Sequence, residues 1–477
     1  MSLRLIYGRA GSGKSHCCLD EIKKSLKSGK PGPFILIVPE QFSLQAEKTL
    51  IKAIGAGGII NVEVLTFKRM AYRVFNSVGG ITRSHINSAG KCMIIQRILE
   101  DKRYEDKTNI FFGISEQQGF VKALSDMITE LKKCNIKPQD LKELIVNYEN
   151  YENYENITRL IYFKEKLEEL EFIYENYESI VYEKYKDADD DLRILYEKLD
   201  ETSMFDGATI WIDEFSGFTV QEYNIIAKLL KKADRINISL CTDCLIDETN
   251  QPAGNIDNGY INFRNSANVS IDYTDIFSPA KVTAKKLLRI AKEAGIRIEL
   301  PCAVERQSGV SYRFNQSPEM DHLEKYLFSF PYKKYGTDKK AEGKTKDISI
   351  YTAANIYTEI EETARDIIRL CRDEGMRYKD IAVVCGNLDL YEKFIKAIFT
   401  QYEIPYFIDK KKEIAGHPLV KLITSVFEIF VYNFSYESVF RYLKTGLTGI
   451  PAEDIDFIEN YVLACGISGN KWTKNEQ

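Results

Sequence analysis

Apolar and polar positions alternate between two periods along the first 80 residues. Short apolar runs of strand length are each followed by a segment whose apolar residues lie three or four positions apart, a spacing typical of an amphipathic helix. Strands are predicted at residues 3–7, 34–40 and 61–67, and helices at 15–29, 42–55 and 68–79. Strands that alternate with helices in this way form a parallel sheet flanked by helices. The pattern therefore predicts an α/β fold.

Strand-like patterns disappear between residues 85 and 204, where Leu, Ile, Tyr, Glu and Lys dominate. We interpret this stretch as a helical insertion. Within it, Tyr-Glu-Asn occurs three times between residues 147 and 156 and again at 174–176. A tyrosine stripe can stack on the bases of single-stranded DNA. Tyrosines at helical spacing more commonly cover a neighbouring helix, however, and the asparagine-rich copies favour an exposed loop.

Strand patterns return after the insertion, at residues 208–215 and 235–243, and fit a return to the first sheet. The first domain is therefore expected to be discontinuous and to consist of residues 1–84 and 205–330. The insertion, residues 85–204, separates these two parts.

A linker is expected next, because residues 331–346, PYKKYGTDKKAEGKTK, have the composition of an exposed connection. Beyond it, residues 347–477 begin a second α/β domain. Strands are predicted there at 347–354 and 380–386, with a helix at 356–374 between them.

Composition and charge limit the possible functions. An apolar fraction of 44% in 477 residues indicates a globular protein of about three domains. The net charge of -5 argues against general electrostatic attraction to nucleic acid, so any DNA contact must be local. Basic clusters occur at Lys23–Lys30, Lys333–Lys346 and Lys410–Lys412, and each is more commonly a solvated face or linker.

The sequence offers no membrane segment and no zinc motif. No run approaches the roughly 18 apolar residues of a membrane span, so a cytoplasmic protein without membrane contact is expected. The ten cysteines are scattered, and the pair Cys241 and Cys244 lacks the further ligands that zinc requires. We expect reduced thiols and assign no metal cluster in this chain.

The strongest motif is GRAGSGKS at residues 8–15, which fits the phosphate-binding pattern GxxxxGK[ST] at every fixed position. Its glycines let backbone amides turn toward phosphate oxygens, and the following helix presents its positive end. Lys14 would neutralise the β and γ phosphates, and the Ser15 hydroxyl would ligate Mg²⁺. The expected cofactors are ATP and Mg²⁺. The predicted nucleotide-binding residues are Gly8, Arg9, Ala10, Gly11, Ser12, Gly13, Lys14 and Ser15.

An acidic pair follows the strand pattern at residues 208–215. Asp213 would hold Mg²⁺ through water, and Glu214 would orient or deprotonate the attacking water. Acidic residues after strands are also common as helix caps, but the phosphate-binding loop favours the catalytic interpretation. Ser15, Asp213 and Glu214 are therefore the predicted metal and hydrolysis residues.

Polar residues after the second and third strands are candidates for contact with a polymer. Loops at this edge of a nucleotide-driven sheet are where DNA would be touched, although an ordinary cap or surface residue is an equal alternative. The candidate DNA contacts are Gln41, Gln45, Thr66, Phe67 and Arg69.

Five segments together resemble the AddB family, also called RexB, whose members are the B subunits of the bacterial ATP-dependent helicase/deoxyribonuclease AddAB. They occur in the family's order and are GRAGSGKS, IVPEQFSLQAE, VLTFKRMAYRVF, IWIDEFSGFTVQE and the stretch from Gly375 to Val420. The last segment also resembles the start of the second motor domain of superfamily I helicases. The resemblance implies a P-loop, superfamily I helicase-like fold.

The resemblance also implies a heterodimer with an AddA-type motor subunit that unwinds and degrades DNA ends for recombinational repair of double-strand breaks. The family's carboxy-terminal nuclease domain and its four-cysteine iron-sulfur cluster are expected to be absent from this chain, which stops at Gln477. Consequently no nuclease residue or cluster ligand is assigned.

Two departures from superfamily I motors bear on activity. The loop begins at residue 8, which leaves no room for an upstream adenine-reading glutamine. Cys385, Gly386 and Asn387 stand where an arginine would meet the γ phosphate, and such arginines are worth on the order of a thousandfold in rate. We expect an ATP-binding, DNA-holding scaffold with weak or no motor activity. The alternatives are a stand-alone DNA-dependent ATPase or helicase, and a non-catalytic interaction module with a structural nucleotide.

Overall fold

The computed structural model describes residues 1–28, 32–55, 62–79, 84–101, 109–112, 119–149, 157–245, 256–257, 260–261, 275–304, 312–329, 331–336, 345–409 and 414–472. The chain divides into two compact units, Met1–Ser349 and Ile350–Gln477. The domain boundaries drawn from the sequence stay predictions.

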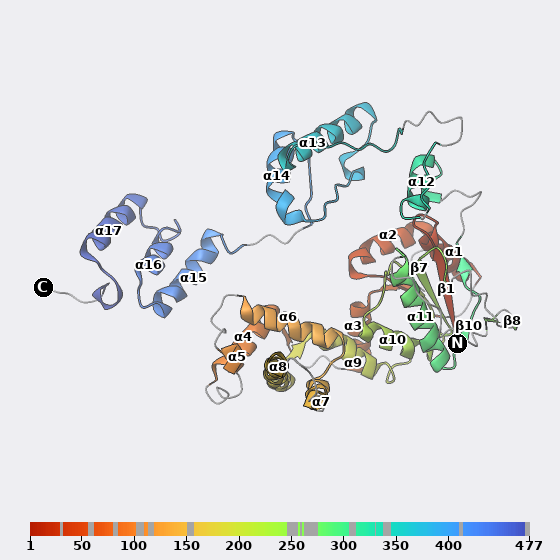
Figure 1. Ribbon diagram of the computed structural model, residues 1–477, viewed down its shortest axis with the longest axis horizontal. Helices are drawn as coiled ribbons and strands as arrows, with labels where there is room; N and C mark the ends of the chain where they lie inside the picture. The colour runs from red at the N-terminus through yellow and green to blue at the C-terminus, as the bar shows by residue number, and fades with distance from the viewer. Residues whose placement is uncertain are drawn as a thin grey trace. The chain divides into compact units, whose positions relative to one another are not determined.

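A parallel sheet of seven strands forms the centre of the first unit (Figure 1). Its strand order is β10-β1-β7-β6-β2-β3, and β11 also pairs with β1. Its strands are β1 (Ser2–Gly8), β2 (Phe34–Ile37), β3 (Val62–Leu65), β6 (Thr209–Ile212), β7 (Arg235–Cys241), β10 (Arg297–Ile298) and β11 (Cys302–Ala303). Each of these pairings is parallel. The predicted α/β fold with a parallel sheet is confirmed.

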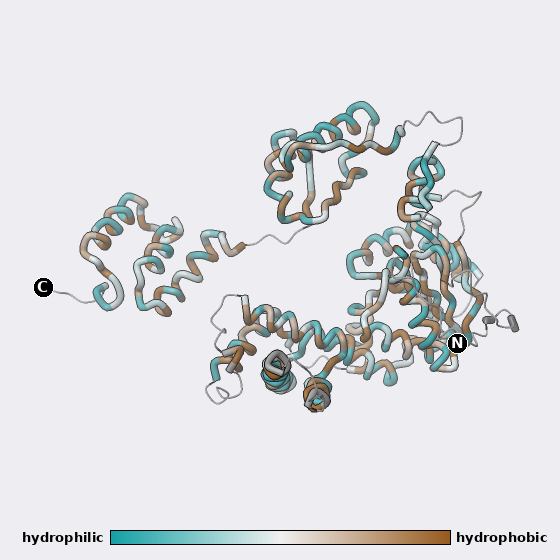
Figure 2. Tube along the Cα trace, viewed as in Figure 1, coloured by the Kyte–Doolittle hydropathy of each residue, from teal (hydrophilic) through white to brown (hydrophobic). Residues whose placement is uncertain are grey.

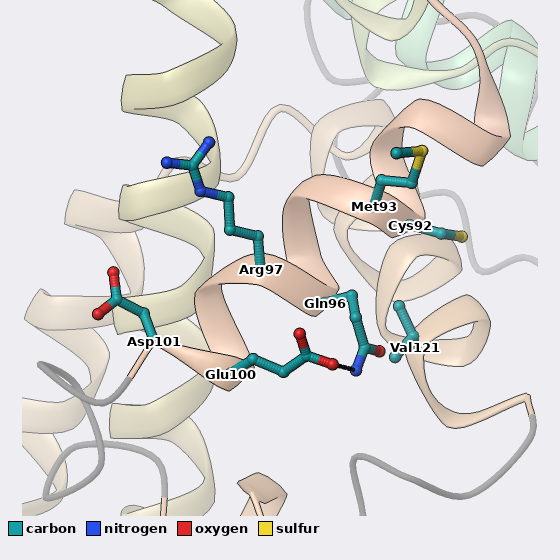
Figure 3. Close-up of a pocket in the computed structure, with 7 residues that line it drawn as sticks. All are labelled: Cys92, Met93, Gln96, Arg97, Glu100, Asp101 and Val121. Carbon is teal, nitrogen blue, oxygen red and sulfur yellow. Dashed lines mark hydrogen bonds between the residues drawn. The ribbon is translucent and has the colours of Figure 1, made fainter. Parts of the chain in front are cut away.

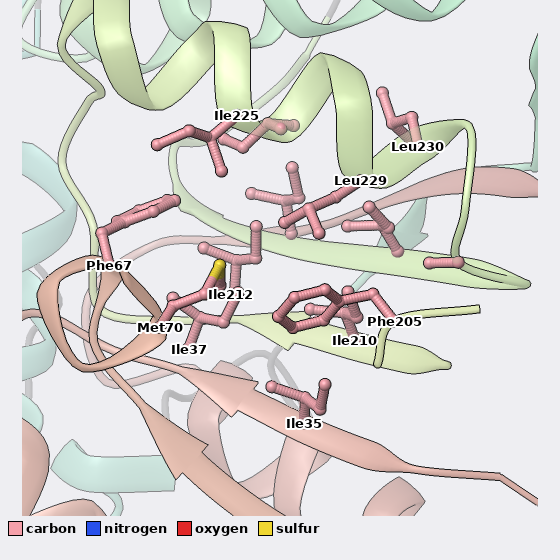
Figure 4. Close-up of a cluster of buried hydrophobic side chains, with 14 of the residues drawn as sticks. Ile35, Ile37, Phe67, Met70, Phe205, Ile210, Ile212, Ile225, Leu229 and Leu230 are labelled. Carbon is pink, nitrogen blue, oxygen red and sulfur yellow. The ribbon is translucent and has the colours of Figure 1, made fainter. Parts of the chain in front are cut away.

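Both faces of this sheet are buried, as parallel sheets require. Along β2, Ile35 and Ile37 face one hydrophobic cluster, whereas Phe34 and Leu36 face another. The helices of the first cluster are α3 (Phe67–Val78), α10 (Val220–Leu230) and α11 (Ser278–Glu293), and those of the second are α1 (Lys14–Lys27) and α2 (Ser43–Ile54). Figure 4 shows the strand residues Ile37, Ile210 and Ile212 beneath Ile225 and Leu229 of α10.

The helical insertion packs around its own hydrophobic cluster, which includes Ile95, Leu124, Ile173 and Tyr177. A two-stranded parallel sheet lies at its base. Its elements are β4 (His85–Ile86), α4 (Ser88–Glu100), α5 (Asn109–Phe112), α6 (Phe120–Lys133), α7 (Pro138–Glu149), α8 (Ile157–Lys184), β5 (Lys186–Asp187) and α9 (Asp191–Lys198). Leu195 of α9 belongs to the first cluster of the large sheet, so α9 connects the insertion to that sheet.

A buried group of charges also holds the insertion in place. Lys132 Nζ contacts Asp187 Oδ2 at 2.9 Å and Asp190 Oδ2 at 3.0 Å. The Tyr177 hydroxyl donates to Asp187 Oδ2 at 2.9 Å. Gln221 of α10 donates from Nε2 to the Lys132 carbonyl oxygen at 2.8 Å. The network therefore joins α6, α8 and β5 of the insertion to α10 beside the large sheet.

Most of the Tyr-Glu-Asn copies between residues 147 and 156 lie outside the described residues. In the copy at 174–176, Tyr174 is buried and its hydroxyl donates to the Ile136 carbonyl oxygen at 3.0 Å. Asn176 donates to the Phe172 carbonyl oxygen at 2.9 Å. This copy packs against neighbouring protein and offers no ring for stacking on bases.

The second unit is helical in the residues that the structure describes. Its helices are α13 (Ile356–Asp373), α14 (Leu388–Gln401), α15 (Pro418–Val431), α16 (Tyr436–Leu443) and α17 (Ala452–Cys465). The prediction of strands at 347–354 and 380–386 is wrong, because neither segment pairs with another strand among the described residues. A strand exists through hydrogen bonds to a neighbour, and Ile350 and Val384 are 92% and 91% exposed here.

The first unit also contains the strands β8 (Ile256–Asp257) and β9 (Tyr260–Ile261) and the helix α12 (Pro318–Tyr326). None of the helices in the described ranges has the length and apolar content that crossing a membrane would take. Figure 2 shows apolar residues interspersed with polar ones along α15 of the second unit.

Candidate nucleotide-binding site

The glycine-rich loop joins the end of β1 at Gly8 to the start of α1 at Lys14. Gly11 and Gly13 have φ angles of 72° and 102°, a left-handed region that favours glycine. A Cβ atom on Gly8 would lie 2.6 Å from Ser12 Oγ and 2.8 Å from the Val304 carbonyl oxygen. All three glycines of the motif are therefore required by local geometry.

Lys14 and Ser12 occupy the inside of the loop. The Lys14 ammonium donates to the carbonyl oxygens of Gly8 at 2.9 Å and Arg9 at 3.0 Å. Ser12 Oγ is buried and makes no hydrogen bond, although buried hydroxyls ordinarily have a partner. The first turn of α1 carries no acidic side chain, so its positive end is not neutralised there. The loop thus combines a cation, an unpaired hydroxyl and a helix amino terminus, all suited to phosphate oxygens.

The predicted acidic pair lies at the carboxyl end of β6, beside this loop. Asp213 is 6% exposed, and its Oδ1 accepts a hydrogen bond from Ser239 Oγ of β7. Glu214 has a φ of 67°, which is rare for a residue with a side chain and costs on the order of 1–3 kcal/mol. The Ser15 hydroxyl donates to Glu214 Oε1 at 2.8 Å. The structure therefore brings Ser15 and Glu214 together and holds Asp213 at the end of β6, against Ser239 of the neighbouring β7.

The side chain of the loop residue Arg9 contacts α12. Its Nε donates to Glu324 Oε1 at 2.9 Å and its Nη2 to the Glu324 carbonyl oxygen at 2.6 Å. The guanidinium also lies 5.0 Å from the ring centre of Phe277. The Arg9 side chain therefore anchors α12 to the loop, and a role of this residue in nucleotide binding stays a prediction.

Two residues from the end of the first domain reach the loop and were missed in the sequence. The Arg313 backbone N–H donates to the Gly11 carbonyl oxygen at 3.2 Å. The Tyr312 ring is 72% exposed and lies 6.2 Å from the His16 ring. The motif pattern carries no signal for either residue, because about 300 positions separate them from the loop.

The end of β7 supplies further polar groups beside the loop. The Thr242 backbone N–H donates to the Gly8 carbonyl oxygen at 3.2 Å. Asp243 contacts Lys281 Nζ at 3.1 Å. Burial opposes ionisation of Asp243, but the hydrogen bond and charge of Lys281 lower its pKa. Asp243 is therefore an ionised carboxylate at this edge of the sheet, and the strand pattern that ends at residue 243 was its only signal.

The five candidate DNA contacts differ in accessibility. Gln41 and Gln45 are exposed. Thr66 is buried and accepts a hydrogen bond from the Arg69 backbone as the cap of α3. Phe67 is 5% exposed, with its ring edge-on to Phe215 and Phe218. The exposed Arg69 pairs with Glu47 at 2.5 Å. Phe67 therefore belongs to the hydrophobic core. The sequence pattern did not indicate this burial.

A groove of about 520 Å³ runs beside Arg69, between α2, β3 and α3, and includes Tyr72 and Arg73 in its lining. A separate hollow of about 660 Å³ lies on the helical insertion, between α4 and Val121 (Figure 3). Gln96 donates to Glu100 one turn further along α4, and Arg97 of the same helix also lines the hollow. No residue of the phosphate-binding loop lines either of them.

Among the residues described, no group of three or more histidine, cysteine, aspartate or glutamate side chains is arranged to hold a metal ion. Cys241 and Cys244 are free thiols. The groups that suit Mg²⁺ are instead the Ser15 hydroxyl and the carboxylates of Asp213 and Glu214, because this ion prefers oxygen ligands and retains water.

Two family models match the chain. One, described as ADDB, N-terminal, matches residues 5–324. The other, described as UvrD-like helicase C-terminal domain, matches residues 312–477 and fits a helicase-like fold.

Similar proteins, named as B subunits of an ATP-dependent helicase/deoxyribonuclease, match the whole chain. The chain is 51% identical over 477 residues to the B subunit of Acetivibrio thermocellus, and the match covers 100% of this chain and 38% of that relative. It is 48% identical over 476 residues to that of Clostridium botulinum, with the same two coverages. It is 44% identical over 472 residues to that of Thermoanaerobacter pseudethanolicus, covering 99% and 37%. The chain thus spans less than two fifths of the length of these relatives.

Proposed function

Because this chain belongs to the AddB family of ATP-dependent helicase/deoxyribonuclease B subunits, we propose that it binds ATP and Mg²⁺ as a helicase-like protein within a larger complex. In this proposal it holds and scans DNA at double-strand ends, together with an AddA-type partner, for recombinational repair in the cytoplasm. Motor activity of the chain alone is weak or absent.

One arrangement supports nucleotide binding above all others. Lys14 and Ser15 follow the end of β1, and Asp213 and Glu214 follow the end of β6. Ser15 and Glu214 are 199 positions apart in the sequence, yet their side chains are in contact. Phosphoryl-transfer sites need a cation for the phosphates, a hydroxyl for Mg²⁺ and carboxylates for metal and water. Each of these groups is available at one edge of the sheet.

Measured affinity for a fluorescent ATP analogue tests this proposal. Replacing Lys14 by Ala removes the ammonium that would face the β and γ phosphates, so affinity is expected to fall at least about tenfold. Lys24→Ala removes an exposed cation from the same helix and serves as the matched control. Equal affinities of the parent and Lys14→Ala would refute nucleotide binding at this loop.

Weak turnover is supported by the segment that precedes α14. Asn387 caps this helix by accepting a hydrogen bond from the Asp389 backbone N–H at 3.0 Å, and neither Cys385 nor Gly386 carries a positive charge. No cation for the γ phosphate is offered at the position where superfamily I motors carry one. Nucleotide binding without appreciable hydrolysis is therefore expected for the isolated chain.

The rival proposal is an active DNA-dependent ATPase, and Arg313 is the observation in its favour. Its backbone contact with Gly11 brings a guanidinium-bearing residue to the loop from within the same unit. Steady-state ATP hydrolysis with and without single-stranded DNA separates the two proposals. Turnover that DNA stimulates and Arg313→Ala abolishes would favour the rival over the scaffold.

A further inference from the structure

A cluster of aromatic and basic side chains lies on α12 and the segment that follows it. We call His322, Lys325, Tyr326, Lys333 and Tyr335 the Tyr326 cluster. The His322 ring lies 4.8 Å from that of Tyr326 and 5.2 Å from that of Tyr335. The ammonium groups of Lys325 and Lys333 lie 5.3 Å and 4.9 Å from the centre of the Tyr326 ring.

The segment after α12 is held in place within this cluster. His322 Nε2 donates to the Lys333 carbonyl oxygen at 2.8 Å, which keeps both lysines beside one ring. Hydrogen bonding from Lys325, with the added charge of Lys333, lowers the pKa of Tyr326. Two cations therefore share a single aromatic platform, an arrangement in which cation–π attraction offsets part of their mutual repulsion.

Two of the three carboxylates of α12 have partners outside the Tyr326 cluster. Glu319 is buried and accepts hydrogen bonds from the backbone N–H groups of Lys346 and Asp347, at 2.7 Å and 2.9 Å. Glu324 is engaged by Arg9. The surface beside the cluster instead carries the exposed Lys334 and two exposed rings, Phe328 at 74% and Tyr332 at 69%.

This combination has a specific ligand chemistry. Proteins bind single-stranded nucleic acid by pairing cations that follow the phosphates with aromatic rings on which bases stack. Bases within a duplex are already stacked and paired, so exposed rings gain little there. We propose that the Tyr326 cluster, with Phe328 and Tyr332, binds single-stranded DNA.

This site rests on the proposed DNA-processing function but differs from its five predicted contacts, which follow β2 and β3. It lies beside the nucleotide loop, because Arg9 Nη2 donates to the carbonyl oxygens of Glu324 and Lys325 at 2.6 Å and 3.4 Å. A strand held here would therefore touch the helix that Arg9 anchors.

The test is binding of a fluorescein-labelled oligothymidine to the full chain across a series of salt concentrations. Removing both lysines, in Lys325→Ala/Lys333→Ala, should weaken binding about tenfold. It should also reduce the salt slope by about 1.4, since each single-strand phosphate contact contributes about 0.7. Tyr332→Ser should weaken binding about tenfold, whereas Tyr332→Phe, which keeps the ring, should bind like the parent.

The matched control is Arg289→Ala/Lys292→Ala, which removes two exposed cations from α11 of the same unit. An unchanged salt slope in the lysine variant, or an equal loss in the control, overturns the proposal. Competition by polyglutamate as strong as that by oligothymidine would identify an acidic-peptide surface and also overturn it. Affinity for the ATP analogue is measured in each variant. If the unchanged chain binds the ATP analogue and the lysine variant keeps full affinity for DNA, this DNA site is refuted. The proposed nucleotide-binding function would remain in that case.

Discussion

The Ser15 hydroxyl donates a hydrogen bond of 2.8 Å to Glu214 Oε1. This contact joins the first turn of α1 to the residue that follows Asp213 at the end of β6. A hydroxyl that donates its proton to a carboxylate keeps both lone pairs available. The contact therefore orients Ser15 for a cation without occupying the oxygen that would bind it.

Replacing Ser15 by Ala should act only when Mg²⁺ is present. A single ligand to a charged partner is worth about 1.5 kcal/mol or more, so affinity for the ATP analogue with Mg²⁺ should fall about tenfold. Affinity in a chelating buffer should stay within about twofold. Titrations under the two conditions measure both values, with Ser28→Ala at the far end of α1 as the control. Equal losses with and without Mg²⁺ would remove Ser15 from the metal site.

The left-handed backbone at Glu214 predicts an unusual order of stability. Because Ala resists a positive φ and Gly does not, Glu214→Gly should be more stable than Glu214→Ala by about 1 kcal/mol. At Glu197, an exposed helical position of α9, the order should reverse, with Ala favoured by about 1 kcal/mol. Urea unfolding of the four variants measures both differences. The same order at both positions would contradict a strained backbone at Glu214.

The buried ammonium of Lys132 predicts a large loss of stability on its removal. In Lys132→Met, the carboxylates of Asp187 and Asp190 lose a buried partner, and breaking such a pair costs about 3–5 kcal/mol. Lys133→Met, which removes a half-exposed neighbour paired with Glu130, should change stability by less than about 1 kcal/mol. Urea unfolding followed by circular dichroism compares them. Similar losses in both variants would show that the Lys132 network contributes no specific stability.

The lowered pKa of Asp187 predicts that the stability of the folded chain depends on pH. Burial opposes its ionisation, but the Lys132 charge and the hydrogen bond from Lys91 lower its pKa from 3.8 to about 2. A lowered folded-state pKa gives stability that is complete above about pH 4 and is lost as the pH falls through about 2. Stability of the parent should fall by about 2 kcal/mol over that range. Asp187→Asn should lack this part of the decline, and an unchanged profile would contradict the assignment.

The thiol of Cys17 is predicted to react slowly. Burial, followed by the charge of Glu21, raises its pKa to about 11, and the thiolate is the reactive form. At pH 8, iodoacetamide should therefore modify the exposed Cys134 well before Cys17. Peptide mass spectrometry at successive times gives the two rates. Faster modification of Cys17 than of Cys134 would contradict a protonated, half-buried thiol beside the loop.

Local patterns predicted much of the first unit. The phosphate-binding loop and the two carboxylates depend on neighbouring residues and on the alternation of strand and helix. The order of elements from β1 to α3 likewise matches the apolar periodicity of the first 80 residues. Residues 380–386 show where such patterns fail: their apolar run is typical of a strand, but a strand needs a hydrogen-bonding neighbour, and none pairs with them among the described residues.

The positions of individual side chains within the site depended on distant parts of the chain. Arg9 lies in a motif for nucleotide binding, yet its guanidinium pairs with Glu324, 315 positions away. Phe67 was a candidate DNA contact because it follows the third strand, but its ring packs against Phe215 and Phe218. The sequence by itself determined the loop, the first three strands and the acidic pair, because short-range spacing and backbone geometry specify them. Only the tertiary structure decided which side chains meet at the loop, because long-range packing brings α12, β7 and Arg313 to it.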